Sequence, residues 1–297
     1  MREQFVTMSG EGWKQNSFPY RLYRKAKKLG VWDPEDIDFT QDRRDWDQLD
    51  ERKRWEIMQL ISQFQAGEEA VTLDLLPLIM VIAKEGRLDE EMYLTTFLFE
   101  EAKHTEFFRH FLNQMGENGD LTVYHTDTYK QIFQEILPTA MTRLEHDHSR
   151  VALVEAATVY NLFVEGVLAE TGYYSFHTTL EKEGIMPGLL QGIALLKKDE
   201  ARHISYGTYL LQRCIAEDDS LYDVVMQKME ELIPYAIKMQ HESIKEKPVS
   251  AFGTTNDLYN QFMMKQAHVR MEVLKRARGK SLDEVYRYDE EEAGTVL

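Results

Sequence analysis

A Glu-x-x-His motif that occurs twice is the feature that most constrains how this chain can fold. Each copy is preceded by a Lys-Glu-Gly sequence and, further back, by another glutamate. In both halves the Lys-Glu-Gly sequence lies midway between that glutamate and the motif, and its glycine is typical of a turn. Each half therefore predicts a helical hairpin whose two arms bring their acidic and imidazole side chains to the same height. In chain order these side chains are Glu68, Glu101, His104, Glu165, Glu200 and His203.

This set of side chains matches a two-metal site inside a four-helix bundle. Residues three apart lie on the same face of a helix, so the Glu and His of each motif can serve one metal ion. A glutamate from each of two helices and a Glu-x-x-His from each of the other two is the ligand set of di-iron and di-manganese bundles. Four carboxylates and two imidazoles suit manganese or iron. Zinc and iron–sulfur sites favour cysteine, and the chain has a single one, Cys214.

The sequence around the motifs favours a buried site over a chance pattern. With 51 acidic residues and 9 histidines, one Glu-x-x-His can arise by chance on a charged helix face, but two in matched hairpins are not expected. Apolar runs precede both motifs, at residues 97–99 and 193–196, so the arms are expected to be buried. A buried carboxylate needs a partner, and a metal ion supplies one.

Composition and charge set the context for this site. The 297 residues contain no Pro- or Ser-rich linker, so we expect one domain over residues 1–297, with the ligand bundle at about 50–216. Hydrophobic residues make up 43% and occur in periodic stretches interrupted by charge. We therefore expect no transmembrane span and no signal peptide, and infer a cytoplasmic protein. The net charge of −16 would repel nucleic acid and argues against it as a partner.

Helical periodicity and turn residues predict an all-α fold. The amino-terminal end is expected to be rich in loops as far as about Asp45, and no convincing β-strand pattern is found. The two glycines within residues 116–120 are expected to end the second arm. The predicted helices span about residues 50–84, 89–116, 128–145, 149–180, 187–216, 220–247 and 256–278.

The order of the six side chains resembles that of the ferritin-like superfamily, which implies a four-helix bundle with additional helices. The amino-terminal region narrows the resemblance. Its segment Trp32–Asp38 (Trp-Asp-Pro-Glu-Asp-Ile-Asp) is similar to the Trp-x-Pro-Glu-Glu-x-Asp segment of ribonucleotide reductase small subunits. In that family the tryptophan contacts an aspartate that holds the first histidine ligand. The resemblance thus implies that Trp32 contacts Asp199 and that Asp199 fixes the imidazole of His104.

One position departs from the reductase pattern. Four residues after the first histidine ligand, those subunits carry a radical-storing tyrosine, whereas this chain has Phe108. The chain instead resembles the ligand-binding oxidases related to the reductase subunit. They have a valine three residues after the first glutamate ligand and a tyrosine five residues before the third, joined by an ether cross-link. The matching residues are Val71 and Tyr160, and Tyr173 resembles another tyrosine near the site.

The two cross-link candidates differ in how spacing supports them. Helical spacing places Val71 on the face of Glu68. Five residues of an α-helix turn through about 140°, so for Tyr160 the resemblance alone implies a place beside the metals.

The resemblance also implies an activity and its partners. It implies activation of dioxygen by one manganese and one iron ion, with manganese held by Glu68, Glu101 and His104. The residues themselves leave two iron ions as an alternative. The centre would form the cross-link between Val71 and Tyr160 and oxidise a hydrophobic substrate by two electrons. A long-chain fatty acid at the metals and a homodimer are implied as well.

Three other functions stay open at this point. A ribonucleotide reductase small subunit would need a radical tyrosine where Phe108 stands. A ferritin-like storage protein predicts a shorter chain and gives no role to Val71 and Tyr160. An acyl desaturase or monooxygenase would share all six ligands, and differs in the Trp32 segment and in whether Tyr160 is cross-linked.

Overall fold

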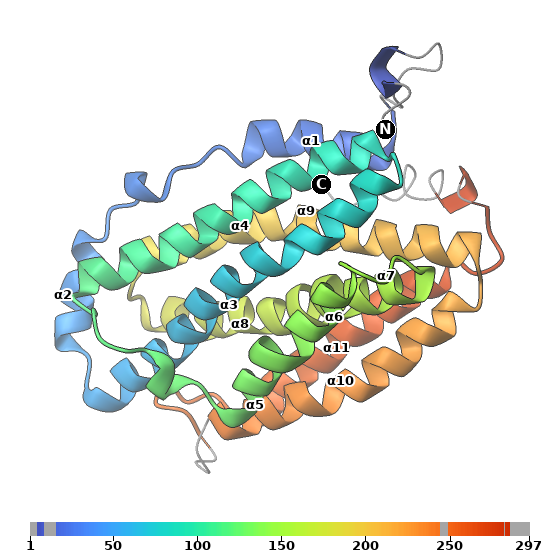
Figure 1. Cartoon of the computed structure of the whole chain (residues 1–297). Coiled ribbons are helices and arrows are strands. Elements are labelled where there is room, and N and C mark those ends of the chain that lie inside the picture. The colour runs from blue at the N-terminus through green and yellow to red at the C-terminus, as the bar shows by residue number, and fades with distance from the viewer. Residues whose placement is uncertain (1–4, 9–15, 244–248, 282, 286–297) are drawn as a thin grey trace.

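The fold is all-α, as the sequence predicts (Figure 1). The computed structural model describes residues 5–8, 16–243, 249–281 and 283–285, and within these ranges every regular element is a helix. The α-helices are α1 (Phe18–Leu29), α2 (Thr40–Gln48), α3 (Glu51–Lys84), α4 (Leu88–Met115), α5 (Asp127–Gln131), α6 (Leu137–Arg143), α7 (Arg150–Ala157), α8 (Glu170–Phe176), α9 (Pro187–Glu217), α10 (Leu221–Ser243) and α11 (Asn256–Lys275).

The two predicted hairpins form the centre of the bundle. Helices α3 and α4 lie side by side in the first hairpin (Figure 1), and α4 ends at Met115, where Gly116 caps it as expected. In the second hairpin, α9 pairs with the arm Arg150–Glu181. Gly86 and Gly184 turn the chain with φ of 74° and 68°, a left-handed conformation that glycine adopts without steric cost. Both Lys-Glu-Gly sequences are therefore turns, as predicted.

The third arm differs from a regular α-helix. It consists of α7, a π-helix at Thr158–Ala169 (η5), α8 and a second π-helix at His177–Glu181 (η6). In a π-helix each N–H bonds to the carbonyl five residues earlier instead of four, so residues five apart come close to the same face. Hydrophobic periodicity carries no signal for this change, and the sequence predicted an ordinary helix here.

This arm is also strongly apolar. By length and composition the segment Arg150–Glu181 meets the requirements of a membrane span, but 83% of its most apolar window is buried inside the protein. Helices α9, α10 and α11 all contact η5. Such burial is typical of the core helix of a bundle.

The amino-terminal region is helical, and the prediction of loops as far as Asp45 was wrong. The Ser17 hydroxyl accepts a hydrogen bond from the backbone N–H of Tyr20 and so caps α1. Helix α1 buries Leu22 and Ala26 and contacts α4 and α9. Leu22 and Ala26 lie four residues apart on one face, and most of the arginines and lysines are exposed on the others, so the helical pattern was present in the sequence but was missed because it covers only 12 residues.

Helix α2 fixes the start of α9 through Asp42. The Asp42 carboxylate is fully buried and accepts hydrogen bonds from the backbone N–H groups of Gly188 and Leu189 at 2.8 and 2.7 Å. A carboxylate at a helix N-terminus satisfies free N–H groups and interacts favourably with the helix dipole. The amino-terminal region therefore holds the arm that carries the second motif.

The remaining helices follow the prediction in outline. The helix expected at about 128–145 is divided into α5, a π-helix at Ile132–Ile136 (η4) and α6. Helix α10 contains Pro234 and is described as far as Ser243, so its predicted end at residue 247 lies outside the described residues. Both α10 and α11 cover the third arm.

Gly192 of α9 provides a test of how closely this bundle is packed. A Cβ atom at this position would lie 2.0 Å from Cε2 of Phe107, whose side chain is fully buried. We expect Gly192→Ala to lower the free energy of unfolding by about 1–3 kcal/mol, even though alanine favours a helix by about 1 kcal/mol. Thermal unfolding followed by circular dichroism measures the change. Gly119→Ala, which has open space around it, is the control, and an equal Tm for both variants would contradict close packing.

Candidate metal centre

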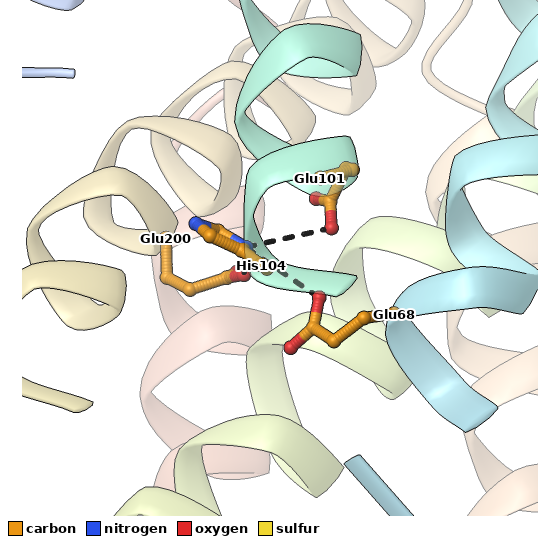
Figure 2. Close-up of side chains that lie close together, drawn as sticks. All are labelled: Glu68, Glu101, His104 and Glu200. Carbon is orange, nitrogen blue, oxygen red and sulfur yellow. Dashed lines mark ion pairs between the residues drawn. The ribbon is translucent and has the colours of Figure 1, made fainter. Parts of the chain in front are cut away.

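Four arms of the bundle bring the six predicted side chains to one buried place. Each is at most 5% exposed to solvent. They are Glu68 on α3, Glu101 and His104 on α4, Glu165 on η5, and Glu200 and His203 on α9. Figure 2 shows four of these side chains, from three helices, pointing toward one another.

The six side chains form two clusters that can each hold a metal ion. Within each cluster the candidate ligand atoms all lie within 4.8 Å of one another. The first cluster comprises Glu68, Glu101, His104 and Glu200, and the second comprises Glu101, Glu165 and His203. Glu101 belongs to both and is therefore placed to bridge two ions.

Both imidazoles present Nδ1 to the carboxylates. Nδ1 of His104 lies 3.5 Å from Oε2 of Glu68 and 3.5 Å from Oε1 of Glu200. Nδ1 of His203 lies 3.0 Å from Oε1 of Glu101. These two nitrogens, both oxygens of Glu101 and one of Glu200 are buried and have no well-formed hydrogen bond among the described residues. An ion in each cluster would give these converging buried atoms a partner, so the residues present fit two metal ions.

Burial makes the charged form of these carboxylates unfavourable in free energy unless cations lie nearby. Burial raises the pKa of Glu68 to about 8. Burial, followed by the charge of Glu200, raises the pKa of Glu165 well above its usual range. Burial opposes protonation of His104 and His203, but the surrounding carboxylates outweigh it and raise the pKa of both. Two divalent ions would supply the positive charge that four glutamates need.

Each imidazole is held from behind by an acidic residue of the other half of the chain. Nε2 of His104 lies 3.3 Å from Oδ2 of Asp199, and Nε2 of His203 lies 2.9 Å from Oε2 of Glu100. Such partners fix the orientation and tautomer of a ligating imidazole. Asp199 was predicted from the family resemblance, whereas Glu100 was not. The signal was present, because an acidic residue directly precedes the glutamate in both copies of the motif.

Glu100 and Asp199 form an outer layer around the six candidate ligands, and two cations complete it. Lys103 and Arg202 occupy equivalent positions, each directly before a histidine of the motif. Lys103 Nζ lies 2.9 Å from Asp199 and donates to the carbonyl oxygen of Gly30 at 2.7 Å. The guanidinium of Arg202 donates to both Glu100 and Asp199. The outer acids are thus neutralised by the protein, and the charge of the four inner glutamates is left to the ions.

Trp32 is joined to the same layer. Its Nε1–H donates to Oδ2 of Asp199 at 2.8 Å, and its ring is stacked on His104 with centroids 6.3 Å apart. Lys103 Nζ lies 4.3 Å from the centre of the Trp32 ring. The structure therefore brings Trp32, Asp199 and His104 together in the order that the resemblance implied.

Val71 and Tyr160 also meet beside the clusters. Both are buried, and the Tyr160 hydroxyl donates to the backbone carbonyl oxygen of Val71 at 3.1 Å. Tyr160 lies in the π-helix η5, five residues before Glu165. In a π-helix, residues five apart lie close to one face, so Tyr160 and Glu165 face the same side. In an α-helix they would be rotated away from each other by about 140°.

The two other positions named from the sequence are aromatic and buried. Phe108 packs against Phe64 with ring centroids 5.3 Å apart, and Tyr173 packs against the same ring at 4.9 Å. The Tyr173 hydroxyl has no hydrogen-bond partner among the described residues. Phe108, at the sequence position where the reductase pattern has a radical tyrosine, is therefore part of a cluster of aromatic rings.

A cavity of about 170 Å³ adjoins the clusters, and all four candidate glutamate ligands line it. It lies between α3, the third arm, α10 and α11. The apolar part of its wall includes Val71, Val164, Leu168, Phe176, Met239 and Met263. These residue types also make an ordinary bundle core, so the sequence did not predict the cavity.

Comparison with known proteins agrees with this geometry. The family model of the ribonucleotide reductase small chain matches residues 16–277. The helices and the buried carboxylate and histidine clusters are those of a ferritin-like fold.

Solved structures narrow the relationship. One is an R2-like ligand-binding oxidase with valine replaced by isoleucine and an aerobically reconstituted Mn/Fe cofactor. It is 40% identical with a TM-score of 0.86, and the match covers 92% of this chain and 99% of that chain. Another such oxidase, with glycine replaced by phenylalanine and an anaerobically reconstituted Mn/Fe cofactor, is 41% identical with a TM-score of 0.85, over 92% and 98% of the two chains. The chain thus belongs to the ribonucleotide reductase small chain family, and within it is similar to the R2-like ligand-binding oxidases.

Proposed function

We propose that this protein is an oxygen-dependent dimetal oxidase that oxidises a hydrophobic substrate by two electrons. The observation that carries the proposal is that two candidate metal clusters, the contact of Val71 with Tyr160 and an apolar cavity share one buried place. The solved oxidases that the chain resembles contain a Mn/Fe cofactor. We assign manganese to Glu68, Glu101 and His104, and iron to Glu165, Glu200 and His203. Glu200 lies in the first cluster, but its Oε2 is also 3.6 Å from Nδ1 of His203, within reach of the second ion.

The residues of the chain prepare this site for its chemistry. When bound, the metal pair supplies the redox chemistry that reduces dioxygen and oxidises a C–H bond. Glu100 and Asp199 accept the Nε2 protons of the two imidazoles, so that both Nδ1 lone pairs face the ions. Trp32 and Lys103 hold Asp199 in turn.

Val71 and Tyr160 are the proposed first target of the oxidation. The O–H bond of Tyr160 and a C–H bond of Val71 break, a C–O bond forms, and two electrons and two protons pass to dioxygen. Burial, followed by the charge of nearby carboxylates, raises the pKa of Tyr160 well above its usual range. The phenol is therefore protonated before the reaction and is held against Val71 by its hydrogen bond.

A long-chain fatty acid is the proposed ligand of the cavity. Two trivalent ions would exceed the charge of four glutamates, and an external carboxylate offsets part of the excess. The apolar wall formed by Leu168, Met239 and Met263 offers the alkyl chain a place next to the clusters. Phe108, which has no phenolic oxygen, argues against the radical role of a reductase subunit.

We also propose a homodimer in the cytoplasm. Leu73, Leu76 and Met80 of α3 are 67, 43 and 56% exposed and lie three and four residues apart, so they form an apolar stripe on one face of the helix, of the kind that marks interfaces. A second copy of the chain could cover it by two-fold symmetry. The single cysteine, Cys214, is buried and free, which fits a reducing compartment.

The cross-link can be tested directly by mass spectrometry. The protein is prepared without metal, supplied with manganese, iron and oxygen, and digested. We expect a peptide pair joined through Val71 and Tyr160 and lighter by two hydrogens. Tyr160→Phe should lack the link, because it removes the phenol oxygen and keeps the ring, whereas Tyr174→Phe should retain it. Unlinked peptides alone, from protein that has bound metal and consumed oxygen, would show that the proposal is wrong.

The ligand cavity can be tested by filling it. Leu168→Trp places a larger side chain in the wall, and we expect the amount of fatty acid that copurifies with the protein to fall sharply. Native mass spectrometry and lipid extraction measure this amount. The control is Leu29→Trp on the exposed side of α1. Equal lipid content in both variants would place the ligand elsewhere.

Glu100 offers a test of the outer layer. Glu100→Gln keeps the size of the side chain but removes the charge that makes the His203 imidazole a stronger ligand, and we expect metal affinity to fall roughly 10- to 100-fold. Isothermal titration calorimetry with Fe²⁺ in the absence of oxygen measures the affinity of the site that includes His203. Glu106→Gln, on the exposed face of the same helix, is the control. An affinity equal to that of the control would mean that Glu100 does not support His203.

A further inference from the structure

A column of aromatic side chains starts at the second cluster. The Phe97 ring is stacked on His203, with centroids 3.7 Å apart and planes at 6°. Tyr93 follows at 6.1 Å from Phe97, and Tyr206 follows at 5.1 Å from Tyr93. All four side chains are fully buried. An unbroken path of π-systems therefore leaves the His203 side of the centre, whereas Trp32 lies on the His104 side.

The column continues to a helix on the outside of the bundle. The Tyr209 ring lies 6.2 Å from Tyr206, and Phe18 of α1 lies 5.6 Å from Tyr209. Tyr209 is 3% exposed and Phe18 is partly buried. Helix α1 lies on the outer side of α4 in Figure 1, so the column spans the distance from the clusters to the surface.

A single buried carboxylate serves the outer tyrosines. The Tyr206 hydroxyl donates to Oε2 of Glu90 at 3.0 Å, and the Tyr209 hydroxyl donates to Oε1 at 3.5 Å. Arg213 and Arg87 lie 3.3 and 3.7 Å from Oε1 and stabilise the charged form of Glu90. Burial raises the pKa of Glu90 overall, which makes it a better proton acceptor than an exposed glutamate.

Packing alone gives no reason for tyrosine at these positions. Phenylalanine would fill the same volume, and a buried hydroxyl is costly unless it is paired. Tyr93 has a buried hydroxyl with no partner among the described residues, and the other two need a buried carboxylate with its own arginines. A tyrosine differs from phenylalanine in that it can lose an electron and a proton together.

We propose that Tyr206 and Tyr209, with Glu90 as proton acceptor, form a one-electron relay between the metal centre and the surface at α1. The relay rests on the proposed oxidase function, because the oxidant is the oxygen-treated centre. Tyr206 gives one electron to that centre through Tyr93 and Phe97, and its phenolic proton passes to Glu90. A soluble one-electron reductant then returns an electron through Tyr209, and the proton returns from Glu90 to Tyr206. The net change is one electron moved from the reductant to the centre.

The relay is tested by electron paramagnetic resonance of rapidly frozen samples. Metal-loaded protein is mixed with oxygen, and tyrosine deuterated on the ring identifies the radical. We expect a tyrosyl signal in the wild type, loss of most of it in Tyr206→Phe, and slower quenching of it by ascorbate in Tyr209→Phe. Tyr174→Phe, whose ring stacks on Phe262 away from the column, is the control and should match the wild type.

The outcomes separate the relay from the oxidase. Both substitutions keep the aromatic ring, and metal content and Tm confirm that each variant is folded and loaded. A tyrosyl signal and an ascorbate dependence that are unchanged in Tyr206→Phe and Tyr209→Phe would overturn the relay alone. A wild-type centre that oxygen does not oxidise, as followed by its optical absorption, would overturn the oxidase function and the relay with it.

Discussion

The exchange of partners between the two motifs is the interaction on which the rest of the site depends. Asp199, directly before the second motif, holds His104 of the first, and Glu100, directly before the first motif, holds His203 of the second. Each helix therefore orients the imidazole of the other, so α4 and α9 must lie in one register. Lys103 and Arg202 neutralise the two acids, which confines the uncompensated charge to the inner glutamates. A metal pair then becomes the missing part of an arrangement that the protein has otherwise completed.

Much of the centre could be predicted from the sequence because its signals are local. Short stretches of sequence encode the ligand spacing, the Lys-Glu-Gly turns and the apolar arms. The two hairpins and the all-α fold class follow from these signals. The meeting of Trp32 with Asp199 was available only by family resemblance, because the two residues lie far apart in the chain. Glu100 shared the duplicated pattern, but its role depends on how α4 and α9 face each other.

Other features depend on tertiary structure and could not be predicted. The π-helical register of η5 changes the backbone hydrogen bonds without changing the residue pattern, so spacing gave Tyr160 the wrong angle. Helix α1 carries a helical pattern with Leu22 and Ala26 on its buried face and was missed because that pattern covers only 12 residues; its contacts with α4 and α9 depend on tertiary structure. The cavity is a matter of volume that side chains leave unfilled, and composition does not determine that.

The amino-terminal region has a thermodynamic consequence. It contacts α9 twice, at the helix start through Asp42 and beside the second motif through Trp32, which bonds to Asp199. A metal ion that binds only when α9 is correctly positioned must favour the conformation in which the amino-terminal region packs against α9. That packing must in turn favour binding of the metal ion. The segment that carries no metal ligand thereby shares in the free energy of metal binding, because loading of the ions and packing of the amino-terminal region against α9 are linked equilibria.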